Sequence, residues 1–203
     1  MKKYIGTGAW GIIIPNVYGA TGGQSSAEYA LSVTKYPPQG IRRAGAERAT
    51  GYLARFSEYV KVANNLMLTV LMMETPEAAD DIEEWVKLPG LDVVHMGPYD
   101  LSLRMNVSMD STELREKLRR VEDVCRNAGI PLGGAANTLQ EAHDMFDRGY
   151  RFFTVPGDMQ LLQNGIKDWF GNDADLEFAI SPLRRETGNA GLSAGGIAGI
   201  HYV

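Results

Sequence analysis

Cysteine is almost absent from this sequence, and long apolar runs are missing altogether. The 203 residues include one cysteine, Cys125, so the chain can form no internal disulfide. No stretch approaches the ~18 continuous apolar residues of a membrane-spanning helix. The N-terminal MKKYIGTGAWGIIIPN has a short apolar part broken by glycines and lacks a small-residue cleavage site, so we interpret it as a loop and a strand. These absences predict a cytoplasmic protein without a membrane partner.

The sequence also lacks an excess of positive charge. Lys and Arg number 20 against 25 Asp and Glu, which gives a formal net charge of −5. The sequence therefore has neither the basic footprint of a nucleic-acid-binding protein nor a run of Lys and Arg for a membrane surface. Hydrophobic residues make up 44% and charged residues 22%, as in soluble globular proteins.

The residues most often used as nucleophiles or zinc ligands are scattered. Cys125 falls at an apolar position of a helical pattern, which predicts a buried structural thiol. The histidines His95, His143 and His201 are too far apart in the sequence to indicate a zinc site. We expect His143 on a helix surface. His95 lies on a predicted strand, and its ring points either into a pocket or into the core.

Apolar runs alternate with helical patterns along most of the chain. Strands are predicted at 10–17, 68–73, 91–96, 131–136 and 151–155. Apolar runs without alternation are typical of strands covered on both faces, and their alternation with helices predicts parallel strand–helix units. The fold is therefore predicted to be α/β, either an open doubly wound sheet or a (β/α) barrel. Both architectures bind ligands at the carboxyl ends of the strands.

Several helix boundaries carry specific signals. Thr75 followed by Pro76 is typical of an N-cap and the first helical residue. Asp110 or Ser111 is predicted to open a later helix, which Gly129 ends. These boundaries place helices directly after the apolar runs, as a parallel α/β fold requires.

Two of the predicted strands are followed by an acid. Glu74 comes directly after residues 68–73, and Asp100 follows the Gly97-Pro98 pair that ends residues 91–96. Three interpretations are open. The acids can be helix caps, an acid/base pair, or oxygen ligands of Mg²⁺, which is often held by one or two carboxylates with water and substrate oxygens completing the shell.

The surroundings of the two acids favour the metal interpretation. Neither Glu74 nor Asp100 has a Lys or Arg within three residues along the chain. Gly97 and Pro98 predict a rigid exposed bend, where the backbone N–H groups of Tyr99 and Asp100 can face an anion. A cation beside an anion-binding bend suits a small oxo acid.

Several segments, in this order and spacing, resemble the class II pyruvate aldolases. These are the 4-hydroxy-2-oxoheptanedioate and 2-keto-3-deoxy-sugar-acid aldolases, which are grouped with citrate lyase β-like proteins. The matching segments are AWGIIIPNV (9–17), KYPPQGIR (35–42), ETPEA (74–78), LPGLDVVHMGPYDLS (88–102) and RFFTVPGDMQLL (151–162). The resemblance covers roughly residues 6–170.

The resemblance implies both a fold and a reaction. The family is a (β/α)8 barrel that forms hexamers, so we expect a partial TIM-type barrel of about five strand–helix units over residues 1–170. An irregular, Gly- and Ala-rich extension follows at 171–203. Family members are carbon–carbon lyases that cleave or form 4-hydroxy-2-oxo acids through a metal-stabilised pyruvate enolate. The implied partners are pyruvate, an aldehyde and further copies of the chain.

Site residues carry over from the resemblance position by position. Glu74 and Asp100 match the two carboxylate ligands of Mg²⁺ or Mn²⁺. The backbone at Gly97, Pro98, Tyr99 and Asp100 matches the site that receives the pyruvate carboxylate. A metal there polarises the keto group and stabilises the enolate, so no Schiff-base lysine is required.

The sequence departs from the family in two places. The family's first three strands, which carry a histidine and an arginine of the active site, have no counterpart here, and GATGGQSS (19–26) is about four residues longer than the usual turn. His95 is the nearby residue that we consider as a replacement base. The alternatives to a weakened aldolase are a non-catalytic metal- or oxo-acid-binding remnant and a structural fragment whose acids only cap helices.

Overall fold

The computed structural model describes residues 1–170, which divide into two units, Met1–Val155 and a second unit that begins at Pro156. Strands of the first unit form one parallel sheet in the order β1-β2-β3-β4-β5. They are β1 Gly11–Ile14, β2 Leu68–Met73, β3 Val93–Met96, β4 Leu132–Ala135 and β5 Tyr150–Thr154. Strands that follow one another in chain order belong to a (β/α) barrel, because a doubly wound sheet reverses its order at a switch point. The prediction of an α/β fold forming part of a barrel is confirmed.

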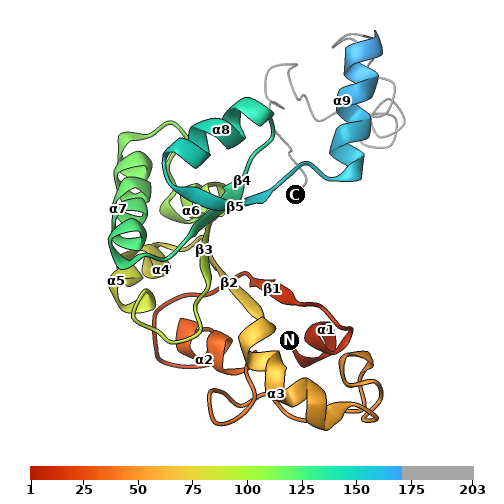
Figure 1. Cartoon of the computed structure of the whole chain (residues 1–203). Coiled ribbons are helices and arrows are strands. Elements are labelled where there is room, and N and C mark those ends of the chain that lie inside the picture. Colours follow the sequence, from red (N-terminus) through yellow and green to blue (C-terminus); the bar gives the residue numbers. More distant parts are fainter. Residues whose placement is uncertain (171–203) are drawn as a thin grey trace, which may run out of the picture. The chain divides into compact units, whose positions relative to one another are not determined.

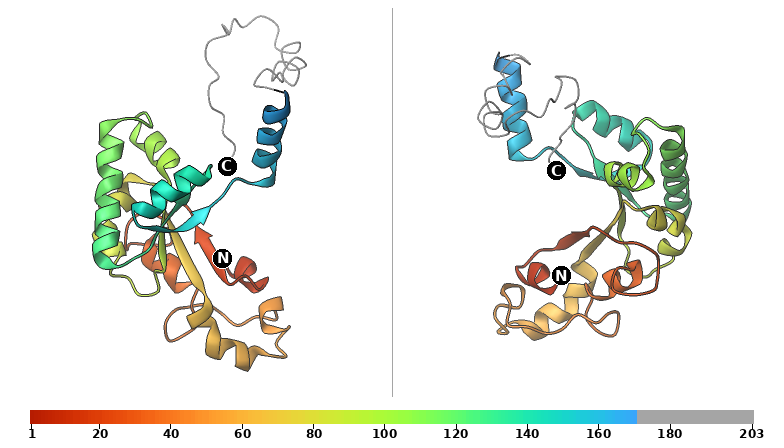
Figure 2. Two further views of the ribbon diagram at one scale, coloured as in Figure 1. Left: turned by 45° about the horizontal axis from the view of Figure 1, so that its top comes forward. Right: turned by 180° about the vertical axis from the view of Figure 1, so that it is seen from behind.

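Helices connect each strand to the next, as Figure 1 shows and as Figure 2 shows from two other sides. In the first unit they are α1 Lys2–Gly6, α2 Ala27–Ser32, the 3-10 helix η1 Arg48–Thr50, α3 Phe56–Leu66, α4 Pro76–Asp80, α5 Ile82–Trp85, α6 Pro98–Met105, α7 Thr112–Ala128 and α8 Leu139–Asp147. The described part of the second unit contains α9 Asp158–Phe170. No helix among residues 1–170 is long and apolar enough to cross a membrane.

The hydrophobic core lies between the helices and one face of the sheet. Alternate strand residues such as Leu71, Met73 and Val94 pack there against Trp85 of α5 and Leu114 of α7, and all five are fully buried. Alternation along a strand directs the intervening residues to the other face. This packing fixes the strand ends, and hence the residues that follow them.

The opposite face of the sheet, which we call the inner face, has its own set of side chains. It carries Val70 of β2, Val93 and His95 of β3, and Phe152 of β5. Gly133 of β4 lies beneath them, because a Cβ there would come within 3.0 Å of Phe152 and 3.1 Å of His95. In a closed barrel this is the face that fills the interior.

Most of the helix boundaries predicted from the sequence are confirmed. Thr75 and Ser111 are the N-caps of α4 and α7, and Gly129 ends α7 with φ 72°. Cys125 is buried in α7, and burial raises the pKa of its thiol to about 12. A thiol of that kind is inert near neutral pH, in agreement with the predicted structural role.

Two local predictions were wrong. Residues predicted as an N-terminal loop form the short helix α1, and the predicted bend at Gly97-Pro98 is the beginning of helix α6. Proline fits the first turn of a helix because the N–H that it lacks would have no partner there. The predicted extension at 171–203 lies outside the described residues.

Candidate active site

The carboxyl ends of β2 and β3 are in register. Met73 pairs with Met96, and the N–H of Gly97 donates to the carbonyl of Met73 at 2.9 Å. Glu74 and Gly97 therefore follow side by side at one edge of the sheet. A Cβ at residue 97 would lie only 2.7 Å from the Cβ of Glu74, so the close approach requires glycine.

Glu74 is buried, with 4% of its surface exposed, and its carboxylate is only partly engaged. Oε1 accepts a hydrogen bond of 2.6 Å from the backbone N–H of Asn16, whereas Oε2 accepts none within residues 1–170. The cap of α4 is the hydroxyl of Thr75, which accepts from the N–H of Ala78 at 3.1 Å. Glu74 is thus a buried acid with one oxygen fixed and one oxygen available to a ligand.

Asp100 lies in the first turn of α6 with its side chain exposed. Within residues 1–170 its carboxylate accepts no hydrogen bond, so it does not cap the helix. The first intrahelical bond runs from the N–H of Leu101 to the carbonyl of Gly97. The N–H groups of Tyr99 and Asp100 precede that bond and point out of the helix end, where an anion can accept from them.

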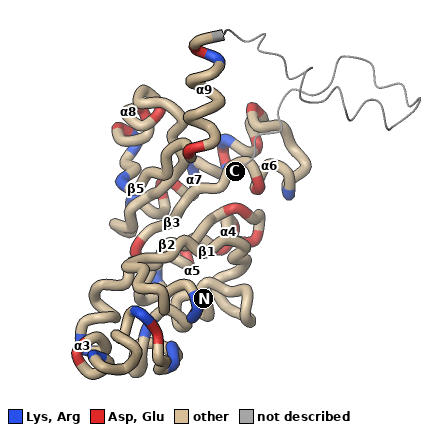
Figure 3. The backbone as a smooth tube through the Cα atoms, turned by 90° about the vertical axis from the view of Figure 1, so that its right-hand side faces the viewer, with Lys and Arg blue, Asp and Glu red and all other residues tan. Residues whose placement is uncertain are grey.

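Arg104, one turn after Asp100 on α6, is a residue that the sequence analysis missed. Its Nη1 donates to the hydroxyl of Tyr18 and its Nη2 to the Oδ1 of Asn16, both at 3.0 Å. The guanidinium carbon also lies 5.4 Å from the centre of the Tyr18 ring. Asp100 and Arg104 are the charged residues of α6, along which Figure 3 shows acidic and basic positions together.

Asn16 links the two sides of the site. Its N–H holds Glu74 and its side-chain oxygen holds Arg104, and it does so with a positive φ of 55°, a region that asparagine tolerates better than most residues. The hydrogen bond to Tyr18, and after it the negative charges of Glu74 and Asp100, raise the pKa of Arg104. The structure thus brings two acids and one guanidinium to the same edge of the sheet.

His95 lies elsewhere, within the inner face. It is 3% exposed, its ring meets that of Phe152 edge-on at 6.1 Å, and its Nε2 lies 3.4 Å from the Oγ1 of Thr154. Its Nδ1 is buried and has no partner within the described part of the chain. Among residues 1–170, these contacts join His95 to β5 and not to Glu74 or Asp100.

A family model for the HpcH/HpaI aldolase/citrate lyase family matches residues 1–165. The chain belongs to this family. A hydroxypyruvate/pyruvate aldolase of Paraburkholderia phytofirmans is 29% identical over 169 residues, covering 80% of this chain and 63% of the relative. A 4-hydroxy-2-oxo-heptane-1,7-dioate aldolase of Salmonella typhimurium is 30% identical over 170 residues, covering 82% and 63%.

Solved structures of the family share the fold. A HpcH/HpaI aldolase/citrate lyase family protein from Burkholderia cenocepacia superimposes with a TM-score of 0.73 at 24% identity, covering 90% of this chain and 68% of that one. The chain spans less than two thirds of the length of the hydroxypyruvate/pyruvate aldolase that it matches. The family resemblance seen in the sequence is therefore confirmed for the fold and for the membership.

The residues of this HpcH/HpaI family member fit a divalent cation with few protein ligands. No group of three or more His, Cys, Asp or Glu side chains within residues 1–170 is placed to hold a metal. Magnesium often takes only one or two carboxylates and leaves the other positions to water and substrate oxygens. Glu74 has an available Oε2 and Asp100 has a carboxylate without a hydrogen-bond partner among residues 1–170, so their assignment as the two ligands stays a prediction.

Gly97 offers a test of the close contact with Glu74. We expect Gly97→Ala to push the Glu74 carboxylate aside, which weakens Mn²⁺ binding and costs about 1–3 kcal/mol of unfolding free energy through overpacking. Gly157→Ala is the matched control, because a Cβ there meets nothing within 4 Å. Calorimetric titration with Mn²⁺ and urea unfolding measure the Mn²⁺ affinity and the unfolding free energy of both variants. Equal values in Gly97→Ala and Gly157→Ala would contradict the close contact between Gly97 and Glu74.

His95 gives the fold a pH dependence. Burial lowers its pKa below the ordinary 6.5, so below that pH the unfolded chain binds a proton that the folded chain resists. The stability contribution of neutral His95 is present in full above pH 6.5 and is lost as the pH falls through the lowered folded pKa. We expect urea unfolding of His95→Leu to depend less on pH between 7.5 and 5, whereas the exposed His143→Leu keeps the slope of the natural chain. Equal slopes in all three proteins would contradict a buried neutral imidazole.

Proposed function

We propose that this chain acts as a carbon–carbon lyase on 4-hydroxy-2-oxo acids, with Mg²⁺ or Mn²⁺ held by Glu74 and Asp100. The observation that carries the proposal is the buried Glu74 carboxylate. One of its oxygens is fixed by Asn16, and the other is available beside Gly97 and the open first turn of α6. The names of the family relatives, which are aldolases, support the reaction class.

Each part of the site has a defined task in this proposal. The N–H groups of Tyr99 and Asp100 bind the carboxylate of the oxo acid, and Asn16 keeps Glu74 oriented. When bound, a divalent cation supplies the positive charge that polarises the keto group and stabilises negative charge as it develops. The bond between C3 and C4 breaks, the 4-hydroxyl loses its proton as the aldehyde forms, and C3 gains a proton to give pyruvate.

A second candidate is an oxo-acid-binding remnant without catalysis. It is favoured by the position of His95, whose ring is buried against β5 and does not contact the two acids within the described residues. The chain then keeps the metal and the anion site but lacks a base for the 4-hydroxyl. Its ligands are the same, so binding alone does not distinguish the two candidates.

Self-association is part of the proposal. Within residues 1–170, β1 and β5 pair on one side only, which leaves two sheet edges open. Open edges favour pairing with another chain. We therefore propose a homo-oligomer, which light scattering after size exclusion would detect.

The decisive assay is release of pyruvate from a 4-hydroxy-2-oxo acid. We expect release with Mg²⁺ or Mn²⁺, a fall to the rate without protein after addition of EDTA, and recovery when excess Mn²⁺ is restored. Release that resists EDTA would contradict a metal-dependent lyase. Metal-dependent binding of pyruvate without any release would identify the remnant instead.

A further inference from the structure

We propose that Arg104 is a positioning residue, which holds the carboxylate of Glu74 in place for the cation through Asn16. This inference rests on the proposed function, because it concerns how that site keeps its geometry. Arg104 itself touches neither the cation nor the substrate. It acts through a chain of hydrogen bonds in the order Tyr18, Arg104, Asn16 and Glu74.

The hydrogen bonds join three segments that are far apart in the sequence. Nη2 of Arg104 on α6 donates to the Oδ1 of Asn16 at 3.0 Å, across 88 residues. The N–H of Asn16, shortly after β1, donates to the Oε1 of Glu74 at 2.6 Å, across 58 residues. Asn16 therefore connects α6 to the end of β2, with its side chain at one end of the connection and its backbone at the other.

Asn16 needs a restraint from outside to keep its N–H on Glu74. It is exposed, it belongs to no helix or strand, and its φ is 55°. Asparagine tolerates that left-handed region but does not prefer it. The angle φ is the rotation about the N–Cα bond, so it sets the direction of the N–H relative to the side chain that Arg104 holds. Releasing the side chain lets residue 16 return to a negative φ, which turns the N–H away from Glu74.

A guanidinium suits this task better than an ammonium. Nη1 of Arg104 donates to the hydroxyl of Tyr18 at 3.0 Å, and the guanidinium carbon lies 5.4 Å from the centre of the Tyr18 ring. Because both nitrogens belong to one rigid plane, the contact with Tyr18 also fixes the donor that Asn16 receives. The ammonium of lysine is a point charge on a flexible stem and does not couple two acceptors in this way. Arg104→Lys therefore keeps the positive charge and removes the restraint.

Two effects of Arg104 on cation binding have opposite signs. Its positive charge repels a cation bound to Glu74, and that repulsion weakens binding. Its hold on Asn16 keeps the Glu74 carboxylate oriented, and orientation of a ligand by a neighbouring residue is worth about 10–100-fold in metal affinity. If only the charge acted, Arg104→Lys would leave the Mn²⁺ affinity unchanged and Arg104→Gln would raise it. The restraint predicts instead that Arg104→Lys lowers the Mn²⁺ affinity.

Calorimetric titration with Mn²⁺ separates these cases. We expect Arg104→Lys to bind Mn²⁺ about tenfold more weakly than the natural chain. Asn16→Gly keeps the N–H and accepts a positive φ without strain, but it removes the Oδ1 that Arg104 holds. It should weaken binding by a similar factor, and adding Arg104→Lys to it should change the affinity no further. Arg119→Lys, which alters an exposed arginine of α7, is the matched control and should bind Mn²⁺ as the natural chain does.

Hydrogen exchange of the Asn16 amide gives a second readout that needs no metal. We expect Arg104→Lys to speed exchange at Asn16 and to leave the amide of Leu71, within β2, unchanged. Faster exchange at both amides would show a general loss of stability and would overturn the inference.

The outcomes also separate the inference from the proposed function. If the natural chain binds Mn²⁺, and Arg104→Lys binds it equally well or adds its effect to that of Asn16→Gly, the inference is overturned and the proposed function stands. If the natural chain binds no Mn²⁺, the proposed function fails and the inference fails with it.

Discussion

Replacing Asp100 by alanine should remove measurable Mn²⁺ binding from this chain. The proposed site has two protein ligands for the cation, Glu74 and Asp100, and no group of three or more acids, histidines or cysteines among residues 1–170 is placed to hold a metal. Loss of an outer-shell partner already costs metal sites about 10–100-fold in affinity, so loss of a direct ligand should cost at least about 100-fold. Calorimetric titration of the natural chain and of Asp100→Ala measures this difference.

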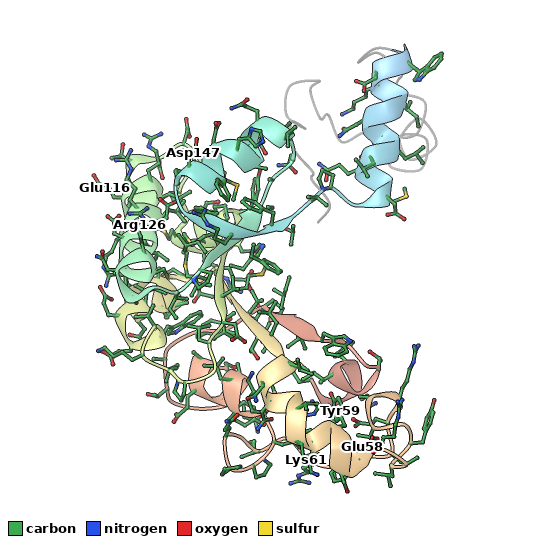
Figure 4. The ribbon with its side chains drawn as sticks, in the orientation of Figure 1. Glu58, Tyr59, Lys61, Glu116, Arg126 and Asp147 are labelled. Atoms are coloured by element: carbon green, nitrogen blue, oxygen red, sulfur yellow. The ribbon has the colours of Figure 1, made fainter. Side chains whose placement is uncertain are left out.

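Matched controls are available on the same unit. Asp147 at the end of α8 and Glu116 on α7 are exposed acids, and Figure 4 labels both. Asp147→Ala and Glu116→Ala change the net charge as Asp100→Ala does but leave Glu74 and Asp100 in place. Equal Mn²⁺ affinity in Asp100→Ala and in these controls would reject Asp100 as a ligand.

Trp85→Ala should lower the unfolding free energy by about 3–5 kcal/mol. Trp85 of α5 is fully buried, and it packs in the core that holds the helices against β2 and β3. Truncation removes its transfer free energy and leaves a cavity. Because single domains are stable by only about 5–15 kcal/mol, the variant should be partly unfolded at moderate temperature.

The control for this substitution is Trp10→Ala. Trp10 is 69% exposed in the same unit, so its loss should change stability by no more than about 0.5 kcal/mol. Urea unfolding followed by circular dichroism at one pH measures both variants. Similar midpoints for the two would show that α5 is not packed as the structure has it.

The scaffold of the site could be predicted because its signals are local. The apolar run at 68–73 forms β2 with the predicted bounds, since Glu74, Thr75 and Pro76 end the strand and begin α4 within three residues. The Gly97-Pro98 pair was harder to interpret. Proline and glycine break a helix when they lie in its interior, but they are compatible with its first residues. Gly97 and Pro98 were therefore predicted to form a bend, whereas they begin helix α6.

Arg104 could not be found from the sequence by a search of nearby residues. A search for Lys or Arg within three residues of Asp100 does not reach Arg104, which lies four positions away. Residues four apart nevertheless share one face of a helix. The signal that would have found it was the helical phase of α6, which was predicted as a bend. Its partners Asn16 and Tyr18 are distant in the sequence, and only the pairing of β1 with β2 brings them to the site.

The direction of the His95 side chain could not be predicted from the sequence. The sequence placed it on the strand before Asp100, but the direction of a strand side chain depends on register, which a single sequence does not fix. In the structure it pairs laterally with Met72 and faces Phe152, so its ring belongs to the inner face. Its proposed role as a base stays a prediction, and the pH dependence described above reports on its burial instead.

The most direct test of the account is a crystal structure of the chain grown with Mn²⁺ and oxalate, with the metal located by its anomalous scattering. We expect one peak bonded at about 2.1 Å to a carboxylate oxygen of Glu74 and to one of Asp100, with oxalate and water oxygens completing the coordination. The available Oε2 of Glu74 should be the bonded oxygen, while Oε1 stays on the N–H of Asn16. A peak bound to neither acid, or no peak with both carboxylates ordered, would contradict the claim that these two strand ends form a metal site.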